Sequence, residues 1–138
     1  MQEHDKWLLI AKEDLMVAKV LLSREFFSSA VYHCQQSAEK SLKGYLAFKK
    51  QEIIKTHDLA KLLGLCLNFD EDFKKLYEAA RYLNPFSIAF RYPTEFDIPD
   101  QGDARLAVKY AQSIITFVLK KVAAPGTGQA DIFGDYEE

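Results

Sequence analysis

Cysteine is scarce in this sequence of 138 residues, which contains only Cys34 and Cys66. The two cysteines lie in separate apolar patterns of helical period and form no Cys-x-x-Cys pair, so disulfide, zinc and redox roles have little support. Free cysteine is among the most frequently buried residue types. We therefore expect both thiols to be small residues of the hydrophobic core.

Histidine is also scarce, and the sequence holds only His4, His33 and His57. A zinc site needs three or four ligands at defined spacings, and no such set surrounds any of the three. The Glu-x-x-His pairs of di-iron bundles are absent, and the tail segment "PGTGQ" lacks the Lys-Ser/Thr ending and the preceding strand of a nucleotide-binding glycine loop. We expect no metal and no cofactor.

Long apolar runs are missing as well. No stretch approaches the ~20 uninterrupted apolar residues that a membrane span requires. The first residues, "MQEHDKWLLIAKEDL", place acids and lysines where a signal peptide needs an apolar segment. We expect a cytoplasmic protein that does not contact membranes.

The residues that are present suit one globular domain, with 49% hydrophobic and 28% charged residues. The net charge of −2 is unevenly distributed. Residues 123–138 hold four acids and no base, which leaves 18 basic and 16 acidic groups in residues 1–122. We expect a helical body over residues 1–122 and a flexible acidic tail over residues 123–138, which is either a solvated extension or a segment that folds back over the body.

Apolar residues recur at three- and four-residue steps in five segments. The pattern predicts helices over residues 5–23, 28–49 and 70–84, over 103–122, and over a shorter segment that begins at Thr56 or Asp58 and ends near Asn68. Because each apolar stripe must be buried against another helix, we predict an all-α antiparallel bundle of four to five helices. Residues 84–102 contain three prolines and no helical period, and a connection of that length in a compact domain is usually functional.

The second helix carries an unexpected polar block. Gln36, Lys40 and Lys43 fall on one line roughly opposite the apolar stripe, and Glu39 can pair with Lys43 at a spacing of four. Gly44 follows, at a cost of about 1 kcal/mol relative to alanine, which close approach by another backbone or chain commonly compensates. Pattern alone leaves three interpretations open: a ligand groove, a dimer seam or a solvated face.

Three segments, "AVYHCQQSAEKSLKGYLAFKK", "KTHDLAKLL" and "RYP", together resemble the HEPN family over most of residues 5–121. The Gln-Gln-x-Ala-Glu-Lys-x-Leu-Lys block joined to Thr-His-Asp-Leu carries the resemblance. It implies a bundle of four or five helices, frequent homodimers and partnership with small nucleotidyltransferases in toxin–antitoxin-like pairs. Some members of the family are metal-independent ribonucleases, and others bind nucleotides or partner proteins.

The ribonuclease members of the family carry an arginine followed, after four to six residues, by a histidine. Arginine can hold the scissile phosphate while the imidazole transfers a proton. This pairing is missing, because Arg91 is followed in that window by Phe96, Asp97 and Ile98 and Arg81 by Phe86, Ser87 and Ile88. The family's nuclease activity therefore cannot be transferred to this sequence by its motif.

We accordingly expect a non-catalytic HEPN module, dimeric, that binds a nucleotide, an RNA or a nucleotidyltransferase partner. Lysine and arginine would contact phosphate, and glutamine would contact a base edge. The candidate ligand-binding residues are Gln36, Lys40, Lys43, His57 and Arg91. The alternative is a metal-independent ribonuclease with an altered active site that uses Arg91 and His57.

Overall fold

The computed structural model describes residues 1–88 and 98–123, and Arg91 and the tail beyond Ala123 lie outside them. Within the described residues the chain is helical and contains no strand. This confirms the all-α prediction. The elements are α1 (Glu3–Ser23), α2 (Phe27–Phe48), α3 (Leu59–Leu67), the 3₁₀ helix η1 (Glu71–Leu76), α4 (Tyr77–Leu83), the 3₁₀ helix η2 (Asn84–Ser87) and α5 (Gln101–Val122).

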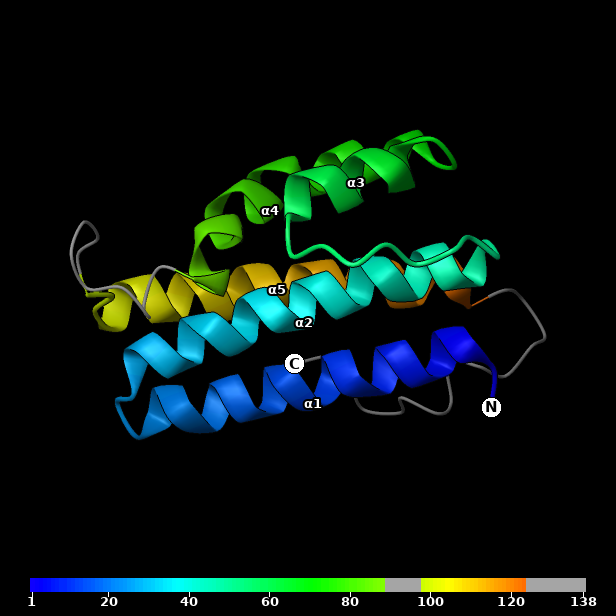
Figure 1. The fold of residues 1–138 in the computed structure, drawn as a ribbon. Helices are drawn as coiled ribbons and strands as arrows, with labels where there is room; N and C mark the ends of the chain where they lie inside the picture. Colours follow the sequence, from blue (N-terminus) through cyan, green and yellow to red (C-terminus); the bar gives the residue numbers. More distant parts are fainter. Residues whose placement is uncertain (89–97, 124–138) are drawn as a thin grey trace.

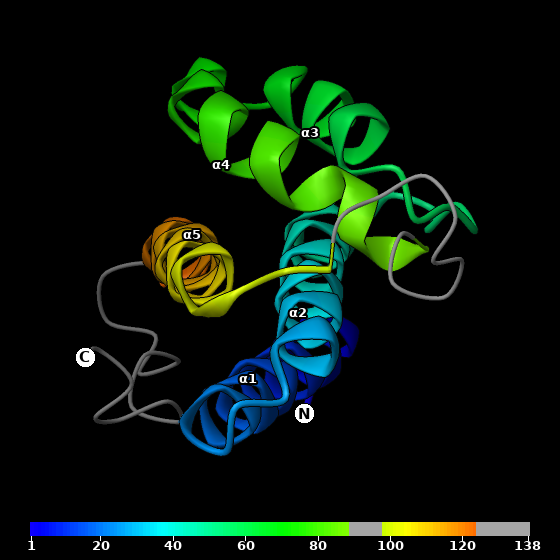
Figure 2. The same cartoon turned by 90° about the vertical axis from the view of Figure 1, so that its left-hand side faces the viewer.

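Helix α2 is the centre of the bundle. Helices α1 and α2 form an antiparallel pair, and α5 lies beside α2 and runs in the same direction, from the same end of the molecule (Figure 1). Helices α3 and α4 form a shorter layer over α2 and α5. Figure 2 shows this layer above α2 and α5, which are seen end on. The segment between α2 and α3 runs back along α2, with Ile53 and Ile54 packed against the core.

Side-chain caps determine where several helices begin. Asp58 precedes α3, and its carboxylate accepts the backbone N–H groups of Ala60 at 3.0 Å and Lys61 at 3.4 Å. Of the two predicted starting residues, Asp58 is therefore the cap, while the Thr56 hydroxyl accepts the N–H of Asp58 at 3.1 Å. These bonds satisfy donors that the first turn of a helix leaves unpaired.

The predicted helix over residues 70–84 is wrong in detail, because the segment is divided. It begins as 3₁₀ helix η1, continues as α4 and ends in η2, which contains Pro85. In a 3₁₀ helix the side chains at positions i and i+3 eclipse. That geometry directs both Phe73 and Leu76, which are 0% and 4% exposed, into the core.

Two helices end without glycine. Glu25 after α1 and Lys50 after α2 adopt left-handed backbone angles, with φ of 66° and 61°. In each turn the next residue's N–H bonds back to a carbonyl five residues earlier, from Phe26 to Leu21 at 2.9 Å and from Gln51 to Leu46 at 3.0 Å. This is the hydrogen-bonding pattern of a Schellman turn, which usually places glycine at the left-handed position.

Gly44 marks a close contact between α1 and α2. A Cβ atom at this position would lie 2.8 Å from Leu8 Cδ2, 3.0 Å from Leu8 Cγ and 3.3 Å from Trp7 Cβ. The close approach that the sequence predicted at Gly44 therefore comes from α1 of the same chain. Glycine is required here by packing.

We predict opposite effects for alanine at two helical glycines. Gly44→Ala should lower the free energy of unfolding by about 1–3 kcal/mol, because the buried Leu8 has no room to move away. Gly64→Ala in α3 should raise it by about 0.5–1 kcal/mol, since its Cβ would meet no atom within 4 Å. Urea unfolding of both variants measures the direction of each change in the free energy of unfolding. A Gly44→Ala variant as stable as the wild type would contradict the packing argument.

Candidate functional site

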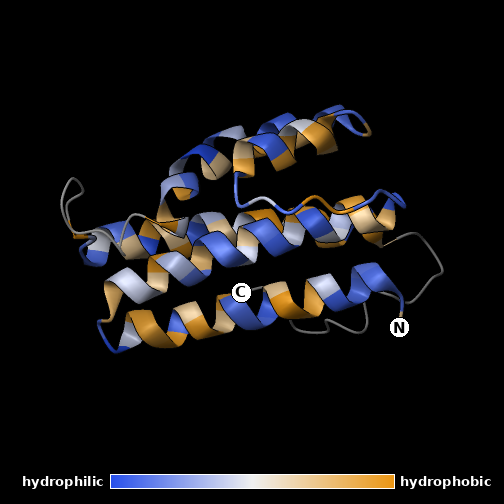
Figure 3. Cartoon of the chain, viewed as in Figure 1, coloured by the Kyte–Doolittle hydropathy of each residue, from blue (hydrophilic) through white to orange (hydrophobic). Residues whose placement is uncertain are grey.

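The polar block of α2 is a buried hydrogen-bond network centred on Glu39. The Glu39 carboxylate is 2% exposed and contacts Lys43 Nζ at 2.8 Å and His57 Nδ1 at 2.9 Å. Lys43 is itself 8% exposed, and its ammonium lies over the Trp7 ring, 5.7 Å from the centroid. A solvated face is therefore the wrong interpretation of this part of α2, whose hydrophilic middle turns are visible in Figure 3.

Glutamines extend the network along the helix. Gln35, which is fully buried, donates from Nε2 to the His57 carbonyl at 2.9 Å and accepts from Gln36 Nε2 at 2.7 Å. Lys40 donates to Gln36 Oε1 at 2.9 Å and lies 3.8 Å from Asp14, which also contacts His33 Nδ1 at 3.0 Å. Polar contacts thus run from α1, across α2, to the segment before α3.

The charge of Glu39 is stabilised by its partners. Burial alone would raise the pKa of this carboxyl, but the hydrogen bonds and charges of Lys43 and His57 outweigh burial, so the pKa is lowered. His57 uses Nδ1 for this contact, and its side chain is 69% exposed. The imidazole is thus held from one side by a buried carboxylate and open to solvent on the other.

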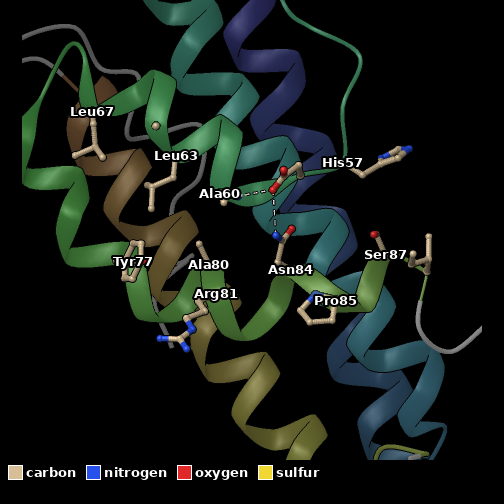
Figure 4. A pocket seen from close by; sticks show the side chains of 13 residues that line it. His57, Ala60, Leu63, Leu67, Tyr77, Ala80, Arg81, Asn84, Pro85 and Ser87 are labelled. Carbon is tan, nitrogen blue, oxygen red and sulfur yellow. Dashed lines mark hydrogen bonds between the residues drawn. The ribbon is translucent and has the colours of Figure 1, made fainter. Parts of the chain in front are cut away.

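A groove lies between α3 and α4, on the outer side of the molecule, and has a volume of about 760 Å³. Figure 4 shows the side chains along it, with His57 at one end and Leu67 and Tyr77 at the other. Its surface is mainly apolar, with Arg81 on one edge. The lining residues are His57, Asp58, Ala60, Leu63, Gly64, Leu67, Tyr77, Ala80, Arg81, Asn84, Pro85, Ser87 and Ile88.

Asn84 fastens the two walls of the groove together. Its Nδ2 donates to Asp58 Oδ1 at 3.0 Å, and its Oδ1 accepts the backbone N–H of Leu59 at 2.8 Å. The hydrogen bond from Asn84 lowers the pKa of Asp58, which therefore remains ionised to a lower pH than usual. Asn84 thereby ties the first turn of α3 to the end of α4.

The structure separates the predicted ligand-binding residues. Gln36, Lys40 and Lys43 belong to the α2 network with His57, and of these four only His57 lines the groove. Arg91 lies outside the described residues. Whether these five residues bind a ligand remains a prediction.

Sequence reasoning missed two residues of the groove. Tyr77 falls in the apolar pattern that predicts the helix over residues 70–84, so the sequence favours its burial. It is 61% exposed, because the change from 3₁₀ to α geometry directly before it shifts the helical phase. Arg81 stands out in sequence only as an arginine without a histidine after it. In Figure 4 the side chains of Arg81 and His57 point away from each other.

Metal ligands and membrane spans are both missing from residues 1–88 and 98–123. These residues contain no group of three or more His, Cys, Asp or Glu side chains placed to hold a metal ion. Nor does any helix in this part of the chain combine the length and apolar character of a membrane span.

Residues 4–122 match the HEPN domain family. The chain belongs to the HEPN family. The match covers every helix of the bundle except the first residue of α1, so the resemblance that rested on the α2 block and the Thr-His-Asp-Leu segment is confirmed. A comparison with curated proteins finds no match.

Two solved structures share the fold. TT1696 from Thermus thermophilus superimposes with a TM-score of 0.77 and 29% identity, over 88% of this chain and 99% of that protein. ST0689, an archaeal HEPN homologue, gives a TM-score of 0.71 and 25% identity, over 89% of this chain and 100% of its own. The bundle is therefore shared along essentially the full length of both relatives.

Replacing Glu39 should destabilise the HEPN bundle in a pH-dependent way. At pH 7, Glu39→Gln should lower the free energy of unfolding by about 3–5 kcal/mol, because Lys43 is left buried without its counter-charge. Since the folded pKa is lowered, the stabilisation from Glu39 is present above the ordinary value of about 4.3 and is lost as pH falls through the folded value. The difference between wild type and variant should therefore shrink in acid.

Urea unfolding at pH 7 and near pH 3 measures this effect. Glu71→Gln is the matched control, since Glu71 is 79% exposed and its ion pair with Lys74 lies at the surface; it should change stability by less than about 0.5 kcal/mol. Equal effects of the two substitutions at pH 7 would contradict the role given to Glu39.

Proposed function

We propose that this HEPN domain binds a nucleoside phosphate, as a free nucleotide or as part of an RNA strand, in the groove between α3 and α4 and does not cleave it. The observation that supports the proposal most strongly is the combination of an apolar groove with two cationic or protonatable groups on its rim. Its volume of about 760 Å³ lies within the range of about 300–1,000 Å³ that is common for ligand sites.

The floor of the groove suits a base. Leu63 and Ala80, each 2% exposed, form its base, Leu67 is partly exposed, and Tyr77 exposes 61% of its area beside them. Stacking of a base on an aromatic side chain contributes about 1–3 kcal/mol and does not depend on which base is present. The site would therefore accept several bases.

The rim suits phosphate. Arg81 is exposed and can donate to two phosphate oxygens at once. His57, at the other end, presents its ring to solvent while Glu39 fixes its orientation. Such contacts release counterions, so binding should weaken as salt is added.

Two features support the proposal that the domain does not cleave its ligand. The sequence lacks the family's Arg-x(4–6)-His pairing, and in the groove Arg81 and His57 point in different directions. A ribonuclease needs the cation and the proton-transfer group at the same phosphate.

Homodimerisation and a nucleotidyltransferase partner in a toxin–antitoxin-like pair are further parts of the proposal, carried by family membership. An apolar strip on the outer face of α1 supports a dimer, and it includes Met16 and Val20, which are 56% and 60% exposed. The two charged residues of the strip, Lys12 and Glu13, have opposite signs, so two copies of it would not repel each other.

One observation favours a second candidate function, a metal-independent ribonuclease that uses Arg91 and His57. A buried carboxylate bonded to Nδ1 orients an imidazole, as catalytic histidines require. The proposal makes Glu39 the positioning residue of that site.

Nucleotide binding should depend on Tyr77 and Arg81. Tyr77→Ala should weaken binding of ATP and of a ten-nucleotide single-stranded RNA about 5- to 100-fold, because a stacking surface is lost. Arg81→Ala should weaken binding and also make it less sensitive to salt, since one phosphate contact is removed. Fluorescence anisotropy at two salt concentrations measures both effects.

Arg105→Ala is the matched control, because Arg105 is an exposed arginine on α5 outside the groove. The affinity of this variant for ATP and for the RNA should equal that of the wild type. Binding of RNA but not of ATP would identify a strand as the ligand, and wild-type affinity in Tyr77→Ala and Arg81→Ala would contradict the proposed site.

The ribonuclease candidate has its own test. We expect the purified protein to leave total RNA and tRNA intact without added metal, and Arg91→Ala and His57→Ala to be equally inactive. Gel analysis of RNA incubated with the three preparations measures this. Cleavage by the wild type that either substitution abolishes would establish the second candidate and refute the first.

A further inference from the structure

The groove between α3 and α4 has an apolar floor that is open in the described part of the chain. Tyr77 and Ile88, at 61% and 55% exposed, are among the more exposed large apolar side chains of residues 1–88 and 98–123. Gly64 lies in the same groove, and a Cβ atom added to it would meet nothing within 4 Å. A mainly apolar concave surface is normally covered by a ligand or a chain segment.

The sequence beyond the described residues holds a segment with matching chemistry. "DIFGDYEE", residues 131–138, alternates Ile132, Phe133 and Tyr136 with four acidic residues and contains no base. Aromatic and aliphatic side chains suit the floor of the groove, and carboxylates suit Arg81 on its rim. The segment thus combines the two chemistries that a nucleoside phosphate would present: a flat apolar ring and a negative charge.

The position of α5 brings this segment within reach. In the last turn of α5, Lys121 Nζ lies 2.8 Å from both Asp70 and Asp72, which follow α3 directly. The end of α5 is therefore fastened beside the Leu67 and Tyr77 end of the groove. Phe133 is ten residue steps beyond Ala123, which allows a span of up to about 33 Å, while the nine residues of α3 are about 14 Å long.

We infer that residues 131–136 of this chain occupy the groove when no nucleotide is bound, and so compete with the nucleotide. Phe133 and Tyr136 lie on the apolar floor and the carboxylates face Arg81. Only the competition with a nucleotide rests on the proposed function, since occupancy of the groove by the tail can be measured without a nucleotide. Because the tail is tethered, its effective concentration at the groove is high, and a weak contact suffices.

Cysteine cross-linking in the full-length protein tests the inference. Gly64→Cys places a thiol in the open part of the groove, and Gly134→Cys places one between Phe133 and Tyr136. The native thiols do not interfere, because both are buried and burial raises the pKa of Cys34 and of Cys66 to about 12. Disulfide formation under mild oxidation is followed by mass spectrometry, with a mixture of isotope-labelled and unlabelled protein to separate bonds within a chain from bonds between chains.

Ser113→Cys with Gly134→Cys is the matched control. Ser113 is exposed on α5 and is nearer in sequence to the tail than Gly64 is. We expect the 64–134 bond to form within one chain at least ten times faster than the 113–134 bond. Arg81→Glu should reduce that preference several-fold, whereas Arg105→Glu should not.

The outcomes separate the inference from the proposed function. Rates within a factor of two at the two positions, or a 64–134 bond formed only between chains, would overturn the inference even if the protein binds ATP. A strong 64–134 preference that added ATP suppresses supports both. The same preference without any effect of ATP or of the ten-nucleotide RNA leaves the tail in the groove and refutes nucleotide binding there.

Discussion

The buried carboxylate of Glu39 is the interaction on which the arrangement of the site depends. A charge taken out of water at the centre of a helical bundle is tolerated only when it is paired and hydrogen-bonded. Lys43, one turn further along α2, supplies one partner, and His57 supplies the other from a different segment. The need to satisfy Glu39 therefore determines where the chain passes between α2 and α3. Helix α3 starts two residues after His57, so the position of the groove follows from the same interaction.

Gln35 and Asn84 make this arrangement specific. Gln35 holds the backbone carbonyl of His57 while Glu39 holds its ring, so both the chain and the side chain are fixed at this point. Asn84 then joins Asp58 and Leu59 to the end of α4. Three successive residues, from position 57 to 59, are thereby bonded to α2 on one side and to the α4 end on the other. Hydrogen-bond networks of this kind favour one geometry over others that bury equal apolar area.

The helices could be predicted from sequence because their apolar residues repeat with helical period, and the α2 stripe of Val31, Cys34 and Leu42 is buried as expected. The polar block could not be interpreted from the same pattern. A helix packed on several sides buries polar residues too, and periodicity does not reveal how many neighbours a helix has. The apolar stripe that helical period predicts in residues 5–23 is correct only in part: its members Ala11 and Ala18 are buried, but Ile10 is 47% exposed, and Leu8, outside the stripe, is buried. Close contact at Gly44 sets which face of α1 turns inward. The groove was missed because Tyr77 and Arg81 acquire their roles only when α4 is placed beside α3.

His33 on α2 and His57 in the segment before α3 both contact a carboxylate, but their surroundings differ, and the difference bears on function. His33 contacts Asp14 at 3.0 Å and is 31% exposed, whereas His57 contacts a carboxylate that is almost fully buried and is itself 69% exposed. A buried carboxylate orients an imidazole more strictly than a partly solvated one, because it cannot exchange its partner for water. Of the two, only His57 lines the groove between α3 and α4. Of the two residues, His57 is therefore the one whose fixed orientation serves a concave surface, and this supports the binding proposal and the ribonuclease alternative equally.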